Sequence, residues 1–172
     1  NLTLTTINGL CRIALDKLKK TYEQDIQEKN IRIIFDNLTL SLMMEVNVEQ
    51  FSKVLAGILK NSMYALLKKS ETVTFSPEIF LGLKVNKDML EITIRDNGSG
   101  IDENIKDKIF APFFTTKTTG EAAGVGLYLC REIVQNHRGT IEVESKKGEY
   151  TQFLITIPVY QPKTITPPKE EE

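Results

Sequence analysis

A long amphipathic helix pattern in residues 47–70 stands directly before two strand patterns in residues 77–96. The two strands are joined by a tight polar turn at Asn86-Lys87-Asp88. A helix followed by a hairpin, within a chain that alternates helices and strands, predicts an α+β fold in which helices cover one face of a mixed sheet. The predicted inward side of the helix contains Phe51, Val54, Leu55, Ile58, Ser62, Ala65 and Leu66.

The flanking sequence adds further helix and strand patterns. Residues 7–31 form one helical stripe. Strand patterns occupy 31–37, part of 38–46, 139–145 and 151–160, and helix patterns occupy 102–110, with Asp102 as N-cap, and 125–137. Residues 161–172 are rich in Pro and Glu, which predicts a disordered tail.

Composition argues against several classes of function. The 172 residues carry a formal net charge of −1, so nothing indicates affinity for nucleic acid or contact with an anionic membrane. No apolar run approaches the roughly 18–20 residues that span a membrane. Cys11 and Cys130 lie in separate apolar helix patterns, which predicts reduced core thiols in a cytoplasmic setting. Because the chain begins at Asn1 rather than Met, we expect a fragment of a longer protein.

Asn61 is the first candidate site residue. Gly57, Asn61 and Ala65 form a column on the predicted helix, because positions four apart share a face. The small neighbours leave room for a ligand at the Asn61 amide, and Gly57 costs a helix roughly 1 kcal/mol relative to Ala. The alternative is a solvated asparagine on an exposed helix face.

The second candidate is Asp96-Asn97-Gly98-Ser99-Gly100, which ends the strand patterns of 77–96. Paired glycines accept positive φ and let a flat group approach without a Cβ clash. A carboxylate at the end of a buried strand can accept hydrogen bonds from an exocyclic amine. The alternative is a hairpin turn, which Asp-Asn-Gly often forms, although Ile101 and a helix pattern follow here instead of a returning strand.

The third candidate is IFAPFFTTK (109–117). Its phenylalanines, Phe110, Phe113 and Phe114, form either a small satellite core or part of a site. Lys117 is either a solvated lysine or a phosphate ligand. The Thr-, Gly- and Ala-rich residues 111–124 predict a mobile loop.

The fourth candidate is Gly124-Val125-Gly126-Leu127, where a helix pattern begins. Free N–H groups and the positive end of the helix dipole favour an anion there. The P-loop and Rossmann motifs are both absent from the sequence.

Taken in order, these stretches resemble the catalytic ATP-binding domain of sensor histidine kinases, within the superfamily that has the Bergerat ATP-binding fold. GILKNSMYAL resembles the asparagine box, DNGSGI the first glycine box and IFAPFFTTK the phenylalanine box. GVGLYLCREIVQNHRGTIEVES resembles the second glycine box with its helix and strand, and GEYTQFLITIP resembles the closing strand. The resemblance covers about residues 5–158.

The resemblance implies a two-layer α/β sandwich with a mixed, mainly antiparallel sheet and a flexible ATP lid. It implies that Asn61 ligates Mg²⁺ and that Asp96 accepts the adenine amino group of ATP. Gly98 and Gly100 would give the base room. The remaining implied ATP-binding residues are Lys60, Tyr64, Ala65, Ile101, Lys117, Gly124, Val125, Gly126, Leu127 and Thr151.

Two departures bear on mechanism. Gly57 stands where many members have a second Asn and where self-sufficient ATPases of the superfamily have a general-base Glu, so efficient hydrolysis by this domain alone is not expected. The one histidine, His137, does not fit the phosphoacceptor box and is interpreted as a structural residue at a helix C-terminus. No catalytic residue is therefore assigned.

The expected function is to present the ATP γ-phosphate to a histidine on a separate dimerisation and phosphoacceptor domain, with a response-regulator receiver domain downstream. We expect a connecting segment at 1–28, the ATP-binding domain at 29–160 and the tail at 161–172. One alternative is a regulator like the anti-sigma-factor serine kinases, which the phenylalanine box argues against. The other is a nucleotide-binding scaffold, which Gly57 leaves open.

Overall fold

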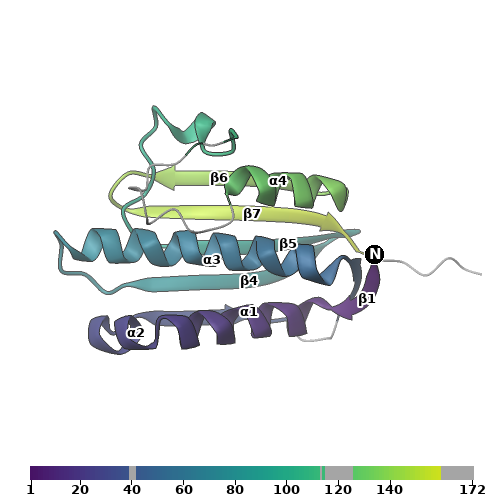
Figure 1. Ribbon diagram of the computed structural model, residues 1–172, viewed down its shortest axis with the longest axis horizontal. Helices are drawn as coiled ribbons and strands as arrows, with labels where there is room; N and C mark the ends of the chain where they lie inside the picture. The colour runs from purple at the N-terminus through teal and green to yellow at the C-terminus, as the bar shows by residue number, and fades with distance from the viewer. Residues whose placement is uncertain (39–41, 113, 115–125, 160–172) are drawn as a thin grey trace, which may run out of the picture.

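The computed structural model describes residues 1–38, 42–112, 114 and 126–159. This part of the chain forms two layers, a sheet and a set of helices that covers one of its faces (Figure 1). The helices are α1 (Ile7–Thr21), α2 (Glu23–Lys29), α3 (Val48–Ser70), the 3-10 helix η1 (Lys106–Lys108) and α4 (Leu127–Asn136). The strands are β1 (Thr3–Thr6), β2 (Arg32–Asp36), β3 (Met43–Val46), β4 (Glu78–Asn86), β5 (Met89–Asp96), β6 (Thr140–Lys146) and β7 (Tyr150–Pro158).

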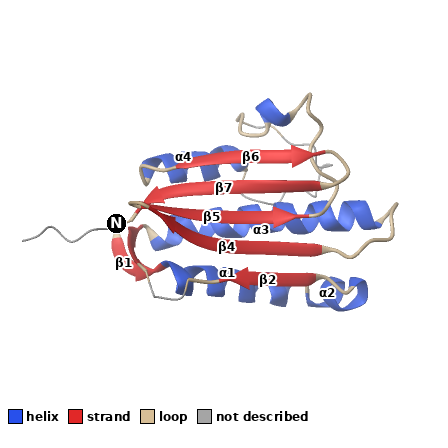
Figure 2. Cartoon of the chain, turned by 180° about the vertical axis from the view of Figure 1, so that it is seen from behind, coloured by secondary structure: helices blue, strands red, loops and turns tan. Residues whose placement is uncertain are grey.

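The main sheet has the strand order β2-β4-β5-β7-β6. The β2–β4 pair is parallel, and the other three pairs are antiparallel. Figure 2 shows the opposite face of this sheet, which no described helix covers. The predicted fold class, a mixed and mainly antiparallel sheet backed by helices on one face, is confirmed.

The core lies between this sheet and α3, which runs across its centre between α1 and α4 (Figure 1). Alternate residues of β5 face the helices, and Leu90, Ile92 and Ile94 are fully buried there. The α3 helix begins as predicted at Asn47, whose side chain accepts a hydrogen bond from the backbone N of Gln50 at 3.0 Å.

Three local predictions differ from the structure. The 7–31 stripe is broken at Tyr22, where φ is −111° and ψ is 26°, so α1 and α2 are separate helices. Residues 102–110 form turns and η1 rather than an α-helix, and the Asp102 carboxylate accepts hydrogen bonds from the backbone N of Asn104 and from the Lys147 ammonium. The short strand β1 was not predicted, and it pairs with β3 in a separate two-stranded sheet.

The prediction that both cysteines are reduced thiols in the core is confirmed. Cys11 and Cys130 are free and fully buried, and burial raises the pKa of each thiol to about 12. Cys11 also shows that α1 contributes to the common core, although the boundary predicted at residue 28 stays a prediction. Among the described helices, none has the length and apolar character needed to cross a membrane.

Candidate functional site

Asp96 is a buried carboxyl group at the end of β5. Its side chain faces the helices, and the residue is 2% exposed. Burial raises its pKa from 3.8 to about 7, although the Gly98 N–H at 2.9 Å and more distant cations oppose this shift. A carboxyl group that is costly to ionise and lies beside a loop is typical of a binding site, where a ligand donor can compensate the lost water.

A second buried polar group, the Ser62 hydroxyl of α3, lies beside this carboxyl. Ser62 contributes to lowering the Asp96 pKa, yet no partner within the described residues meets the distance and angle of a hydrogen bond to its Oγ. Buried hydroxyls are normally hydrogen-bonded, to protein, water or a ligand. The Ser62 hydroxyl can therefore still form a hydrogen bond beside the Asp96 carboxyl.

The loop that follows Asp96 is fastened to α3 and to the start of β4. The backbone N of Ser99 donates to the Ala65 carbonyl at 3.2 Å. The Asn97 amide accepts from the backbone N of Glu78 and donates to the Ser76 carbonyl, both at 2.8 Å. A Cβ added at Gly98 would lie 2.5 Å from the Ala65 carbonyl carbon, so this glycine is required by contact with the helix.

The turn between β6 and β7 holds the same loop from the other side. The backbone N of Gly148 donates to the Ser99 carbonyl at 2.6 Å, and Lys147 pairs with Asp102 at 3.1 Å. Gly100 has a φ of +67°, and a Cβ there would overlap the Lys146 carbonyl oxygen. At both predicted glycines, protein atoms therefore lie too close to the position that a Cβ would take.

Thr151 lies directly opposite Asp96 in the β5–β7 pair and is also buried. Its hydroxyl lies 3.1 Å from the Ser145 hydroxyl, which accepts the backbone N–H of Ile101 at 2.8 Å. Ser145 was not predicted as a site residue. The signal was present, because Ile141, Val143 and Ser145 alternate along β6 and place a serine where an apolar residue is expected.

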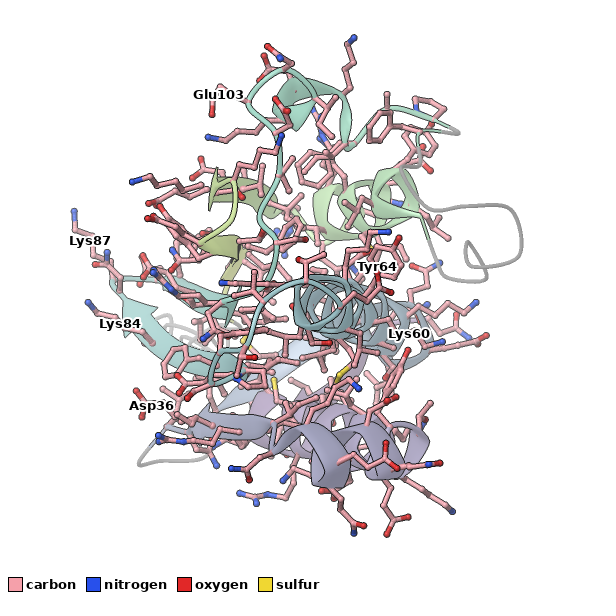
Figure 3. All side chains as sticks on the ribbon, turned by 90° about the vertical axis from the view of Figure 1, so that its left-hand side faces the viewer. Asp36, Lys60, Tyr64, Lys84, Lys87 and Glu103 are labelled. Atoms are coloured by element: carbon pink, nitrogen blue, oxygen red, sulfur yellow. The ribbon has the colours of Figure 1, made fainter. Side chains whose placement is uncertain are left out.

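The predicted residues of α3 divide between two sides of the helix. Asn61, Tyr64 and Ala65 are half-buried, and Ala65 contacts the Asp96 loop. Figure 3 shows Tyr64 on the side of α3 towards α4 and Lys60 on the side towards α1. Lys60 is exposed and also lines a groove with Leu10 of α1. Consecutive helix residues are about 100° apart, so Lys60 points away from the Asn61 side.

The start of α4 is open. Gly126 is the N-cap residue with φ −64° and ψ 149°, and no side chain of the described residues caps the helix. It is exposed, with no described atom within 4 Å of an added Cβ, while Leu127 is half-buried. Lys117, Gly124 and Val125 lie outside the described residues, as do Phe113 and most of the predicted loop at 111–124.

The phenylalanine segment packs as a satellite of the core in its described part. The Phe110 ring meets the Phe153 ring edge to face, with centroids 6.3 Å apart. The Arg131 guanidinium lies over the Phe110 ring, 5.8 Å from its centroid. Phe114 is half-buried against the same core. These contacts favour the packing alternative for Phe110 and Phe114.

His137 lies at the C-terminus of α4, as predicted. Its Nε2 accepts the backbone N–H of Asn47 at 2.9 Å, and its Nδ1 lies 2.8 Å from the Ile133 carbonyl. The two contacts together require a neutral ring with the proton on Nδ1. Because Asn47 caps α3, His137 joins the end of α4 to the start of α3, and both ring nitrogens are engaged.

These residues suit the parts of Mg-ATP. An ionised Asp96 can accept from an amine of the base, with the Ser62 and Thr151 hydroxyls beside it. The Asn61 amide lies one helical turn before Ala65 and offers the oxygen ligand that Mg²⁺ prefers. The uncapped start of α4 provides N–H groups for phosphate oxygens.

Comparisons with known proteins identify the family. Residues 47–161 match the family model described as histidine kinase-, DNA gyrase B- and HSP90-like ATPase. Cyanobacterial phytochrome A of Nostoc sp. is 35% identical over 85% of this chain and 18% of its own length. Sensor histidine kinase ZraS of Salmonella typhimurium is 31% identical over 92% of this chain and 32% of its own.

Solved structures of histidine kinases are also similar to this chain. The catalytic domain of histidine kinase ThkA has a TM-score of 0.74 and 28% identity, covering 92% of this chain and 96% of that chain. ThkA in complex with the response regulator TrrA has a TM-score of 0.68 and 24% identity, covering 92% of this chain and 42% of that chain.

The chain spans about a fifth to a third of the length of the two curated relatives, so it corresponds to one part of such proteins. The matched family region includes the Asn61 helix, the Asp96 loop, the start of α4 and the closing strand. The chain belongs to the family of histidine kinase-, DNA gyrase B- and HSP90-like ATPases, as an ATP-binding catalytic domain of the histidine kinase type.

Proposed function

We propose that this domain binds Mg-ATP between α3, the Asp96 loop and the start of α4, and presents the γ-phosphate to a histidine carried on a separate dimerisation domain. The phosphoryl group then passes to the receiver domain of a response regulator. The observation that carries the proposal is the buried Asp96 carboxyl, whose pKa is raised to about 7 at the end of a central strand.

Recognition of the base is the first part of this function. Asp96 accepts the adenine amine, with Thr151 opposite and with Ala65, Gly98, Gly100 and Ile101 forming the surrounding wall. The loop is held in place by hydrogen bonds to α3 and to the β6–β7 turn, which supports a preformed site. Such preorganisation limits the entropy lost when a ligand binds.

Binding of the phosphates is the second part. Asn61 supplies an oxygen to Mg²⁺, which neutralises phosphate charge when bound. N–H groups of residues 124–127 contact phosphate oxygens, and Tyr64 borders the metal from α3. Lys117 contacts the phosphates from the lid. Lys60 is the weakest of the proposed contacts, because its side chain is directed towards α1.

Transfer to a histidine outside this domain is the third part. Gly57 carries no carboxyl group that could activate water, so the bound ATP is kept for another acceptor. His137 is unsuited as that acceptor, because both of its ring nitrogens are engaged. The name of ZraS and the ThkA complex with a response regulator support the histidine and receiver partners.

Calorimetric titration with Mg-ATP tests the nucleotide site. We expect binding by the wild-type chain and its loss in Asp96→Asn, because the amide turns an NH₂ group towards the adenine amine. Asp36→Asn, at an exposed carboxyl on the edge strand β2, is the control and should bind normally. Equal binding by wild type and Asp96→Asn would refute the placement of the base.

Autophosphorylation tests the acceptor. The parent protein, expressed with the sequence that flanks this chain in its gene, should incorporate phosphate from labelled ATP into an acid-labile, base-stable form, as phosphohistidine is. Acid-stable phosphate on a partner would instead indicate the serine-kinase alternative, and ATP binding without any transfer would indicate a scaffold. No observation presented above favours either alternative.

A further inference from the structure

One buried hydroxyl, that of Ser145 in β6, joins three segments beside the proposed base site. The residue is 8% exposed. Its Oγ lies 2.8 Å from the backbone N of Ile101, 2.7 Å from the Tyr150 carbonyl oxygen and 3.1 Å from the Thr151 Oγ1. Ile101 follows the glycine loop, and the other two residues belong to β7.

The three contacts fix the direction of every proton. A serine hydroxyl has one proton and two lone pairs. An amide N–H only donates, so Ser145 accepts from Ile101, and a carbonyl only accepts, so Ser145 donates to Tyr150. The second lone pair of Ser145 is left for Thr151, whose hydroxyl proton therefore points at Ser145. Thr151 has only lone pairs to offer to any other neighbour.

Thr151 also lies beside the proposed base site. Thr151 and Asp96 are directly opposite in the β5–β7 pair, and both side chains are buried on the helix side of the sheet. Directly opposite side chains on one face are adjacent. An ionised carboxylate is also an acceptor without a proton, so Asp96 and Thr151 both offer acceptors only to a base. Adenine presents an amine at its six-position, whereas guanine presents a carbonyl oxygen there.

We propose that Ser145 is a positioning residue that determines base specificity, because it holds the Thr151 hydroxyl as an acceptor and thereby favours adenine over guanine. The proposal rests on the proposed function, since it requires a nucleotide base beside Asp96 and Thr151. Ser145 acts on the base through Thr151, and its bond to Ile101 holds the adjoining loop at the same time.

The test compares the dissociation constants of Mg-ATP and Mg-GTP by calorimetry at about pH 8, where a carboxyl of pKa about 7 is mostly ionised. Wild type should prefer ATP. In Ser145→Ala the Thr151 proton is released and can turn towards a guanine oxygen, so the preference should fall on the order of 10-fold. Thr140→Ala, at an exposed hydroxyl of the same strand, should leave the preference unchanged.

The ratio of the Mg-GTP and Mg-ATP dissociation constants separates base selection by Ser145 from general support of the loop. If Ser145 only supported the loop, both affinities would fall by the same factor, and an unchanged ratio would overturn the proposal. A double-mutant cycle adds a second criterion. In a Thr151→Val background, Ser145→Ala should no longer alter the ratio, and a change as large as in wild type would also overturn the proposal. Ser145→Thr keeps a hydroxyl and should keep the preference.

Thermal unfolding shows whether each variant is folded before its ratio is used. If Ser145→Ala does not fold, Ser145→Cys provides the same comparison, because a thiol is a weak hydrogen-bonding partner and should also lower the preference. A wild-type chain that binds neither nucleotide would remove the proposed function and this inference with it. Binding of ATP with an unchanged ratio in the folded variants would overturn this inference alone.

Discussion

The two glycine-containing segments of the site are built in opposite ways. In the Asp96 loop, the Cβ positions of Gly98 and Gly100 are blocked by backbone atoms of Ala65 and Lys146. At the start of α4, Gly126 has no described atom within 4 Å of an added Cβ. The first segment therefore requires glycine for its own packing, whereas no contact among the described residues requires it in the second.

This difference indicates that glycine serves a different purpose in each segment. The loop glycines let α3 and the β6–β7 turn approach closely enough to hold the loop by backbone hydrogen bonds. Gly126 makes no such contact with the described residues, and a glycine there suits the proposed approach of a ligand to the N–H groups of α4. The hydrogen bonds of the described residues hold the Asp96 loop in place without a ligand.

Gly98→Ala should have the largest effect. The new methyl group would meet the Ala65 carbonyl carbon at 2.5 Å and its oxygen at 2.7 Å, and neither backbone atom can move without displacing α3. We expect a loss of about 3 kcal/mol or more in the free energy of unfolding, measured with urea. Gly148→Ala is the control: it has open space but a φ of +81°, so it should lose only about 1 kcal/mol. Equal losses in the two variants would contradict the packing argument.

The pH dependence of stability should be of similar size. Between pH 3.8 and about 7 the folded chain holds a proton on Asp96 that the unfolded chain has released. Asp96 therefore lowers stability as the pH rises through this window, by about 1.4 kcal/mol per pH unit.

Asp96→Asn should remove this slope and be more stable than wild type above pH 7, as urea unfolding at several pH values would show. Asp36→Asn should retain the slope. Parallel curves for wild type and Asp96→Asn would mean that the carboxyl is not buried as described.

His137→Leu examines the other end of α4. This substitution leaves the backbone N–H of Asn47 without its acceptor and removes the edge contact with the Phe51 ring, 5.6 Å away. We expect a loss of about 1–2 kcal/mol in unfolding free energy, because an unpaired buried donor costs that much. The neighbouring exposed Asn136→Ala should change little. If both variants were alike, the contacts of His137 would not be what holds this end of α4 to α3.

Gly126→Ala should have the smallest effect on stability. Its φ of −64° and ψ of 149° suit alanine, and no described atom obstructs the methyl group, so the loss should stay at about 0.5–1 kcal/mol, the preference for glycine over alanine at an N-cap. The affinity for Mg-ATP should nevertheless fall several-fold in a calorimetric titration, because the methyl group stands before the helix N–H groups. A stability loss as large as that of Gly98→Ala would end the contrast between the two segments.

The sequence predicted the elements whose signals are local. The α3 helix has a strong apolar periodicity and the β4–β5 hairpin has a polar turn, and the structure has both elements. It did not predict β1, since that strand is defined by pairing with β3 some forty residues away. Nor did it predict Ser145, whose partners Ile101 and Tyr150 come from different segments and meet only in the folded chain.

The glycines of the Asp96 loop show the same limit of prediction from sequence. The spacing of Gly98 and Gly100 suggested clearance for a base, but the atoms beside their missing Cβ groups belong to Ala65 and Lys146. A sequence records that a position lacks a side chain without recording which neighbour requires it. The roles of Lys117, Gly124 and Val125 stay predictions, because these residues lie outside the described part.

The contact of the β6–β7 turn with the glycine loop restricts how this chain can be lengthened. Hairpin turns usually tolerate inserted residues, but an insertion at Gly148 would displace the donor to Ser99 and the ammonium group that meets Asp102. The β4–β5 turn around Lys87 is exposed and carries none of these bonds. A fluorescent label or an epitope belongs at Lys87, where it would report on the domain without altering its nucleotide site.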